Sequence, residues 1–396
     1  MLFLFVGAAG GLGSEPGWRT SWHGALYGYG NMQEVNPDSV LNPDNQMAAI
    51  PTRSAVSELR LSLLAEDERF RLSLRSIASA QDAWSSMGSN FESTERISQC
   101  QVKVRLSDEL NVSAGREVLN WGAAQFRSPS SPFYFANGRS DPMSELTGID
   151  VMKLVWTPDL RSSLQMGYLP DQTFDEDIQG AWGNSCLMKY DWRSDDWAVG
   201  IVAVETPRMP GFYGANGQIA ANDWVLLYAE VGSSAQATGL ESPADIREPF
   251  IVSQPGERKT SALVGTTYTL ENGYSLSAEY LYEGTGYTAG EEKAYFQRAE
   301  SNPGPALQYA PRLLGQHYAD LVWQSNLMEN RGFWRAMVTE NLTDSSTALS
   351  GYGETTLTDH VSVFLTGSWS PGGERQENSA LISYSVTMGL KLALPP

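Results

Sequence analysis

The feature that most constrains the fold of this chain is an alternation of apolar and polar residues with a period of two. In residues 55–64 the odd positions are Ala, Ser or Leu, while the even positions include Glu58 and Arg60. A polar turn at residues 65–68 follows, and residues 70–78 repeat the alternation. Successive side chains of a β-strand point to opposite faces of the sheet, so the pattern predicts a hairpin with one apolar and one polar face.

The same pattern recurs along most of the chain. Further alternating runs occupy residues 99–106, 110–118, 149–157, 162–169, 181–192, 197–206, 261–270, 274–283, 318–325, 333–341, 347–357, 361–370 and 380–394. Short polar turns join many of these runs, whereas long connections are expected at residues 31–54, 80–96, 119–148, 207–221 and 284–316. Short periplasmic turns and long extracellular loops are typical of outer-membrane β-barrels.

The sequence contains no second way of crossing a membrane. No apolar run reaches the 18 residues of a membrane-spanning helix, and a membrane protein without such a run must be a closed barrel. Termini that both lie on the periplasmic side require an even number of strands. The clear strands are one short of even, so we expect an additional strand within residues 231–258. The prediction is an all-β, antiparallel, up-and-down transmembrane β-barrel of about 18 strands, with 16 as the alternative.

Terminal and aromatic residues agree with this class. Residues 1–14 are apolar and then small, and they are expected to be the remnant of a signal peptide before a single barrel domain at residues 15–396. Aromatic residues expected at strand ends beside the short turns are Trp156, Trp192, Trp197, Tyr274 and Trp369, and they would form an interfacial girdle. The predicted location is the outer membrane of a Gram-negative bacterium, with its lipid and lipopolysaccharide as surroundings.

The two cysteines are predicted to remain free. Cys100 and Cys186 both fall on the apolar face, on strands about four apart. Neighbouring strands are ~4.8 Å apart, so the two thiols would be roughly 20 Å from one another, well beyond the reach of a disulfide. We therefore expect two lipid-facing thiols.

The charges predict the character of the lumen. The net charge of −19 argues against a nucleic-acid partner. By strand parity, a basic wall is predicted at Arg60, Arg71, Arg75, Lys103, Arg105 and Lys153, and an acidic wall at Glu230, Glu279, Glu283, Asp320 and Glu354. Opposed walls would orient polar solutes and select ions by sign. Alternatively, the inward charges pair with one another and close the lumen.

Residues 119–148 are the candidate constriction loop, because long structured loops are usually functional. Its candidate residues are Asn120, Arg127, Arg139, Asp141 and Glu145. The alternative is an ordinary extracellular loop. Just before it, Arg116 breaks the pattern, since strict alternation would place this cation in lipid. Either Gly115 forms a bulge that shifts the register, or the strand ends there.

The stretch from Gly115 to Gly122, GREVLNWG, resembles the GRQ-x-x-x-WG segment of large porin-like outer-membrane barrels. These include alginate-export-type barrels and related uncharacterised porin-like families. The similarity covers about a tenth of the chain. Glu117 stands where the family usually has Gln, and residues 394–396 lack the terminal aromatic of many barrels. The resemblance implies an export or uptake channel for a polar or charged solute.

Other classes of function are less well supported by the sequence. The three histidines, His23, His317 and His360, belong to no nucleophile–base motif, so an enzyme, catalytic residues and a cofactor are not predicted. No CxxC or Cys/His cluster predicts a metal site. Two alternatives remain: a closed structural barrel that docks an envelope transport complex, and a soluble carbohydrate-binding β-protein. A homo-oligomer or an envelope-complex partner is left open.

Overall fold

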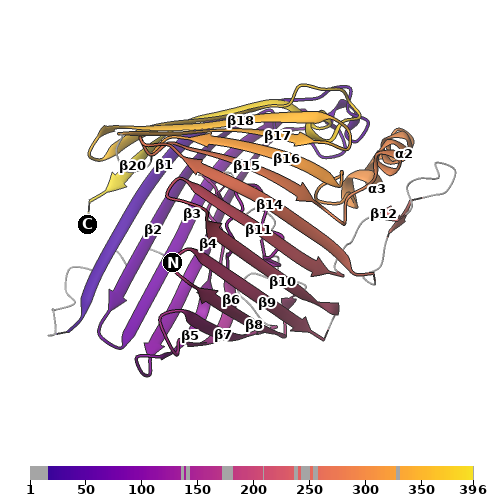
Figure 1. Cartoon of the computed structure of the whole chain (residues 1–396). Coiled ribbons are helices and arrows are strands. Elements are labelled where there is room, and N and C mark those ends of the chain that lie inside the picture. Colours follow the sequence, from indigo (N-terminus) through magenta and orange to yellow (C-terminus); the bar gives the residue numbers. More distant parts are fainter. Residues whose placement is uncertain are drawn as a thin grey trace.

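The protein folds as a barrel of one 18-stranded antiparallel sheet (Figure 1). The computed structural model describes residues 17–134, 138–139, 143–171, 182–207, 209–235, 240–241, 250–252, 257–326 and 331–395. The barrel strands are β1 (Arg19–Val35), β2 (Arg53–Glu66), β3 (Phe70–Ser85), β4 (Gly88–Arg105), β5 (Leu110–Glu117), β6 (Ile149–Trp156), β7 (Ser162–Leu169), β8 (Ser185–Arg193), β9 (Trp197–Thr206), β10 (Met209–Ala220), β11 (Val225–Ser234), β14 (Lys259–Thr269), β15 (Ser275–Tyr282), β16 (His317–Gln324), β17 (Gly332–Asn341), β18 (Ser346–Thr358), β19 (Val361–Trp369) and β20 (Ile382–Leu394).

The barrel is closed by pairing of its first and last strands. β1 pairs with β2 on one side and with β20 on the other, where Gly24 lies opposite Leu394. Each strand therefore has two neighbours, and no strand of the sheet forms an edge along its whole length. The predicted fold class and the count of 18 strands are confirmed, and the alternative of 16 is excluded.

The long connections lie at one rim, which also carries tight turns at residues 86–87 and 342–345, and the opposite rim carries short turns. Residues 36–52, 118–148 and 283–316 belong to the first rim, and residues 67–69, 194–196 and 359–360 belong to the second. We call these the long-loop rim and the short-turn rim. The predicted signal-peptide remnant lies outside the described residues.

Two predicted connections and one predicted strand are wrong. Residues 80–96 form no long loop, because β3 and β4 continue to a tight turn at residues 86–87. Residues 207–221 are mostly β10, which pairs with β9 and β11. Among the described residues of 231–258 there is no additional barrel strand, because β11 ends at Ser234 and pairs directly with β14, and the short β12 and β13 form a sheet of their own.

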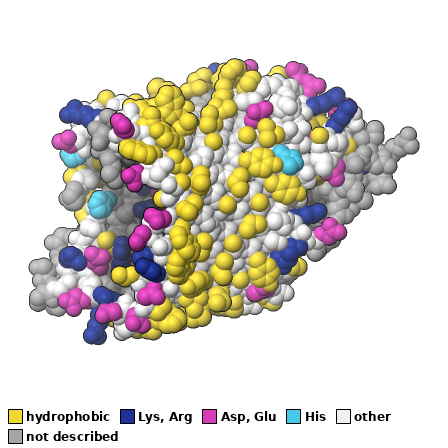
Figure 2. Space-filling model, in the orientation of Figure 1, with side chains coloured by type: hydrophobic (Ala, Val, Ile, Leu, Met, Phe, Trp, Pro, Cys, Tyr) yellow, Lys and Arg dark blue, Asp and Glu magenta, His cyan; other side chains and the backbone are white. Residues whose placement is uncertain are grey.

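Apolar side chains cover the outside of the barrel in a broad band, and charged side chains gather at its two ends (Figure 2). Trp156, Trp197 and Trp369 are exposed on this surface. Trp369 ends β19 at the long-loop rim, so its predicted place beside a short turn is wrong. Cys100 and Cys186 are both exposed and free, as predicted. No helix in the described ranges is long and apolar enough to cross a membrane.

The long loops form a small hydrophobic core of their own at the rim. Helices α2 (Ala289–Ala299) and α3 (Pro303–Gln308) contribute part of it. The short elements of the long loops are η1 (Pro43–Asn45), β12 (Leu240–Glu241), β13 (Ile251–Val252) and η3 (Glu377–Ser379), and residues in or beside them, such as Leu240, join the same cluster. α2 begins at Thr288, which forms a reciprocal capping box with Glu291. Tyr295 and Phe296 are the buried centre of this rim core, which also includes Leu41 and Ala380 from distant loops.

Candidate functional site

The chain leaves the barrel wall at the end of β5 and folds into the lumen. The pairing register runs through Gly115 and Arg116 without a shift, and the strand ends at Glu117. The two explanations for Arg116 were a register shift at Gly115 and the end of the strand, and the structure agrees better with the end of the strand. The Arg116 guanidinium is buried and donates to both carboxylate oxygens of Asp150, at 2.9 and 3.0 Å. A buried arginine in this geometry is neutralised by a partner of matching shape.

The first half of the inward loop packs on one half of the barrel wall. Leu119, Trp121 and Phe133 contact an apolar patch that β6 to β10 present to the lumen, including Val204 and Phe212. Farther along, Ala124 and Phe126 join a second cluster, with Tyr228, Leu263, Leu281, Leu313 and Tyr318. Burial of these apolar side chains holds the loop against this half of the wall. A cavity of about 510 Å³ remains between Trp121 and the short-turn ends of β7 to β10.

Glu230 on β11 holds the loop by its backbone and hydroxyl groups. Its carboxylate accepts hydrogen bonds from the Ala124 amide at 2.9 Å and the Ser130 hydroxyl at 2.8 Å, and from the Ser128 hydroxyl. Gly122 lies against this carboxylate with φ of +91°, and an added Cβ would be 2.2 Å from Oε1. The glycine after Trp121 is therefore required by the close approach of the loop to the wall.

Glu279 on β15 makes a second attachment of the same kind. It accepts from the backbone amides of Gln125, at 2.5 Å, and Phe126, at 2.9 Å. The Tyr228 hydroxyl donates to it at 2.6 Å. Glu230 and Glu279 thus bind backbone N–H groups that would otherwise be buried without a partner.

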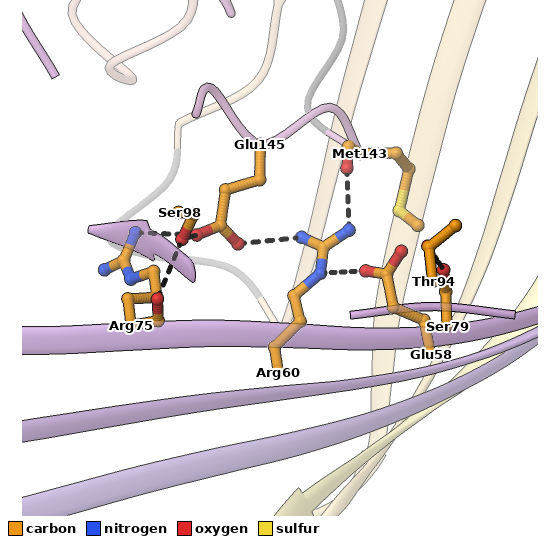
Figure 3. Close-up of polar contacts among 8 residues, drawn as sticks. All are labelled: Glu58, Arg60, Arg75, Ser79, Thr94, Ser98, Met143 and Glu145. Carbon is orange, nitrogen blue, oxygen red and sulfur yellow. Dashed lines mark hydrogen bonds and ion pairs between the residues drawn. The ribbon is translucent and has the colours of Figure 1, made fainter. Parts of the chain in front are cut away.

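The last part of the loop reaches the opposite side, where three neighbouring strands hold Glu145 (Figure 3). Oε1 of Glu145 accepts from Ser98 Oγ at 3.0 Å and from Arg75 Nη1 at 3.3 Å. Oε2 lies 3.6 Å from Arg60 Nη1. Arg60 also donates to the Met143 carbonyl at 2.9 Å and pairs with Glu58. We call the contacts of Glu145 with Arg60, Arg75 and Ser98 the latch.

Two cavities remain on the side of the lumen that the loop does not fill. The first, of about 480 Å³, is lined by Arg71, Arg75, Lys103 and Lys153, with His23 and Glu117. We call it the basic chamber. Lys153 pairs with Glu117, whereas the side chains of Arg71 and Arg75 are 58% and 43% exposed. Arg71 lies 4.0 Å from Glu66 and Arg75 lies 3.3 Å from Glu145, whereas Lys103 has no ion pair among the described residues, so the chamber presents partly paired, exposed cations to solvent.

The second cavity, of about 610 Å³, lies on the other side of the latch. Its lining includes Glu58, Arg60, Arg96, Glu145 and Arg335, together with Ser and Thr side chains of β18 to β20. We call it the mixed chamber. The two chambers share no lining residue, and Glu145 joins Arg75 of the basic chamber to Arg60 of the mixed chamber.

The predicted site residues thus fall into groups with different surroundings. Arg105 lies at the short-turn rim, where it pairs with the exposed Asp108. Glu283 accepts from Ser261 and Thr285, Asp320 accepts from Thr339, and Glu354 pairs with Lys391. Of the loop candidates, Asn120 is half-buried. Arg127 lies over the ring of Phe126, and Arg139 donates to the carbonyls of Ala124 and Gly122. Asp141 lies outside the described residues.

Sequence reasoning missed several members of the site. Glu58, Arg96 and Arg335 line the mixed chamber. Glu58 was accessible to the parity argument, because it alternates with apolar residues in phase with Arg60. Ser98 was not, since it is the residue skipped where the pairing of β3 and β4 shifts register. Within the described residues, no group of three or more His, Cys, Asp or Glu side chains is arranged to hold a metal ion.

Comparison with known proteins identifies the fold. OccAB1 of Acinetobacter baumannii superposes with a TM-score of 0.57 at 13% identity, covering 95% of this chain and 96% of that one. OccK11 (OpdR) and OprD of Pseudomonas aeruginosa give 0.56 at 12% and 0.53 at 9% identity, over 96% and 95% of this chain and 98% and 95% of theirs. No family model and no curated protein matches the sequence. The chain therefore has the fold of these barrels, and the link to alginate-export-type barrels stays a prediction.

Proposed function

We propose that this protein is an outer-membrane channel for small polar or charged solutes, constricted by the inward loop at residues 118–148. The observation that carries the proposal is the one-sided packing of the loop. Its apolar side chains pack against the lumenal side of β6 to β16, and polar cavities of about 480 and 610 Å³ remain on the opposite side. A third cavity, of about 510 Å³, lies between the loop at Trp121 and the short-turn ends of β7 to β10. A wet, polar passage beside a packed loop is the arrangement by which barrel channels set their selectivity.

The proposed passage has an off-centre position and an uneven charge. Glu230 and Glu279 of the predicted acidic wall are buried behind the inward loop, whose amides they bind, so a passing solute does not contact them directly. Arg71, Arg75 and Lys103 of the predicted basic wall line an open chamber. We therefore propose that the basic wall dominates ion selectivity, although the whole chain carries a net charge of −19.

Planar-bilayer recording of the detergent-purified protein in a salt gradient tests this function. The expected result is discrete conductance steps with a reversal potential on the anion-selective side. A folded, inserted protein that shows no steps would contradict the channel. It would favour the closed barrel that docks an envelope complex, whose contacts would then be sought by crosslinking.

A further inference from the structure

The latch has the construction of an anion-binding site that is filled by the protein itself. Its donors come from the barrel wall: Arg60 from β2, Arg75 from β3 and Ser98 from β4, where β3 is hydrogen-bonded to β2 on one side and to β4 on the other. The occupant, Glu145, comes from a segment without regular secondary structure. A site on rigid strands keeps its geometry when its occupant leaves it.

The donors are arranged around both oxygens of one carboxylate. Arg75 Nη1 and Ser98 Oγ lie 3.3 and 3.0 Å from Oε1, and Arg60 Nη1 lies 3.6 Å from Oε2. Other contacts orient Arg60, whose guanidinium lies 4.4 Å from the centre of the Tyr27 ring and pairs with Glu58. Ser98 is fully buried, and the Arg75 carbonyl, 3.4 Å from its Oγ, is an alternative acceptor for the same hydroxyl proton. These groups are the ones that recognise a carboxylate or a related oxyanion.

The charge at the latch leaves a cation in excess once Glu145 departs. With Glu145 in place, two guanidinium groups face two carboxylates, those of Glu58 and Glu145. Without it, Glu58 alone opposes Arg60, and Arg75 has no other acid partner among the described residues. Arg75 also faces the basic chamber, where Arg71 and Lys103 add positive charge.

The two parts of the loop are attached by different forces, which makes the latch the releasable part. Residues 119–134 are fixed by apolar clusters and by the buried carboxylates of Glu230 and Glu279. In the described residues 143–145, Met143 packs on the apolar cluster of Tyr27, Tyr352 and Phe364, and Glu145 is held by the ion pairs of the latch. The Glu145 side chain is 13% exposed, and its partner Arg75 is 43% exposed to the aqueous lumen. Ion pairs that contact water are weaker than apolar burial and can be exchanged for a solute of the same charge.

We propose that Arg60, Arg75 and Ser98 form a binding site for a small carboxylate or oxyanion, with Glu145 as a displaceable internal occupant that separates the two chambers. A solute anion that replaces Glu145 binds where the chambers meet and opens the contact between them. This inference rests on the proposed function for its biological meaning. The binding site itself can be tested without any measurement of conduction.

The test is calorimetric titration of acetate into the folded protein in detergent, with the wild type compared with Glu145→Gln. An internal occupant lowers apparent affinity by the fraction of time that it fills the site. We expect Glu145→Gln to bind acetate about tenfold more tightly than the wild type, and Glu145→Ala to show the same gain. The gain should disappear in Glu145→Gln/Arg75→Gln. Circular dichroism establishes that each variant is folded.

Glu354→Gln is the matched control, because it removes the same charge from another lumenal carboxylate that pairs with one cation, Lys391. Equal acetate affinity in the wild type and both Glu145 variants would overturn the site, as would an equal gain in Glu354→Gln. If the protein conducts but the Glu145 variants bind acetate no more tightly, the channel is supported and the anion site is refuted. If these variants bind acetate more tightly but the protein never conducts, the anion site is supported and the proposed channel is refuted.

Discussion

Arg116 and Asp150 form a buried, two-pronged ion pair at the position where the chain turns from the barrel wall into the lumen. The pair joins the last residues of β5 to the first residues of β6, so it fixes both ends of the inward loop. Because neither group is exposed, each depends on the other for its charge to be tolerated.

Asp150→Asn should therefore destabilise the barrel. Loss of one partner of a buried pair costs about 3–5 kcal/mol, because the remaining charge has no counterpart. Thermal unfolding in detergent, followed by circular dichroism, should show a clearly lower midpoint. Asp108→Asn is the control, since it breaks the exposed pair with Arg105 and should cost less than about 1 kcal/mol. Equal midpoints for the two variants would contradict a structural role for the Arg116 pair.

Charge reversal in the basic chamber should change ion selectivity. Arg71→Glu together with Arg75→Glu replaces two exposed cations of the wall by anions, so the reversal potential in a salt gradient should move toward cation selectivity. Arg105→Glu, at the short-turn rim beside Asp108, should have a much smaller effect. An unchanged reversal potential in the double variant would show that solutes do not pass along this wall.

Removal of the attachments of the loop should widen the passage. Glu279→Ala leaves the amides of Gln125 and Phe126 without their acceptor, which costs about 1–3 kcal/mol of loop docking for each buried group left unpaired. Single-channel recording should then show larger and noisier open-channel currents. Glu283→Ala is a suitable control, because Glu283 also lies in this region of the chain but accepts from Ser261 and Thr285, outside the inward loop. Unchanged currents in Glu279→Ala would mean that the apolar clusters of the inward loop are enough to hold it in place.

The rim core should respond to pH through Glu292 on α2. Burial, with the nearby carboxylates of Asp344 and Glu377, raises the pKa of Glu292 to about 9. The docked helix therefore keeps a proton on this carboxyl that an undocked, solvated one would release near its ordinary pKa of 4.5. The stability that the protonated Glu292 gives to the docking of α2 is complete at low pH and is lost as pH rises through about 9.

Hydrogen exchange of residues 289–299 measures this docking. Exchange corrected for its intrinsic pH dependence should show weaker protection at pH 9 than at pH 6. Glu292→Gln, which stays neutral, should keep the same protection at both values. A wild type whose corrected protection does not change with pH would refute the assignment of a proton to Glu292 in the docked helix.

The sequence predicts the strands because lipid on the outside and polar groups on the inside impose alternation. The alternation is lost where the inward loop, and not water, contacts the lumenal face of a strand. β10 was read as a loop because its lumenal side is rich in small and amide residues, including Gly214. An added Cβ at Gly214 would lie 2.9 Å from the Ser130 carbonyl, and one at Gly232 would lie 1.9 Å from the Pro129 carbonyl. The glycines that admit the loop also remove the signal of the strand.

The site was predictable in its residue types but not in its pairings. Parity placed Glu230 and Glu279 on the lumenal face, but parity carries no information about the backbone amides that they bind. Similarly, Arg60 and Arg75 were identified as cations of one wall, while their common contact with Glu145 depends on the path of a loop without periodicity. Tertiary contacts between an irregular segment and a strand leave no local pattern in the sequence.

The apolar lumen of β6 to β10 has a consequence for how this barrel tolerates change. Leu169 and Val204 face inward and are fully buried, like residues in the interior of a water-soluble protein. At these positions a substitution that shrinks the side chain leaves a void in a packed interior, whereas at the Ser and Thr side chains of β18 to β20 that line the mixed chamber it only enlarges a polar cavity. The packed lumenal positions can therefore vary only by repacking, and the positions that line a cavity are free to change their chemistry.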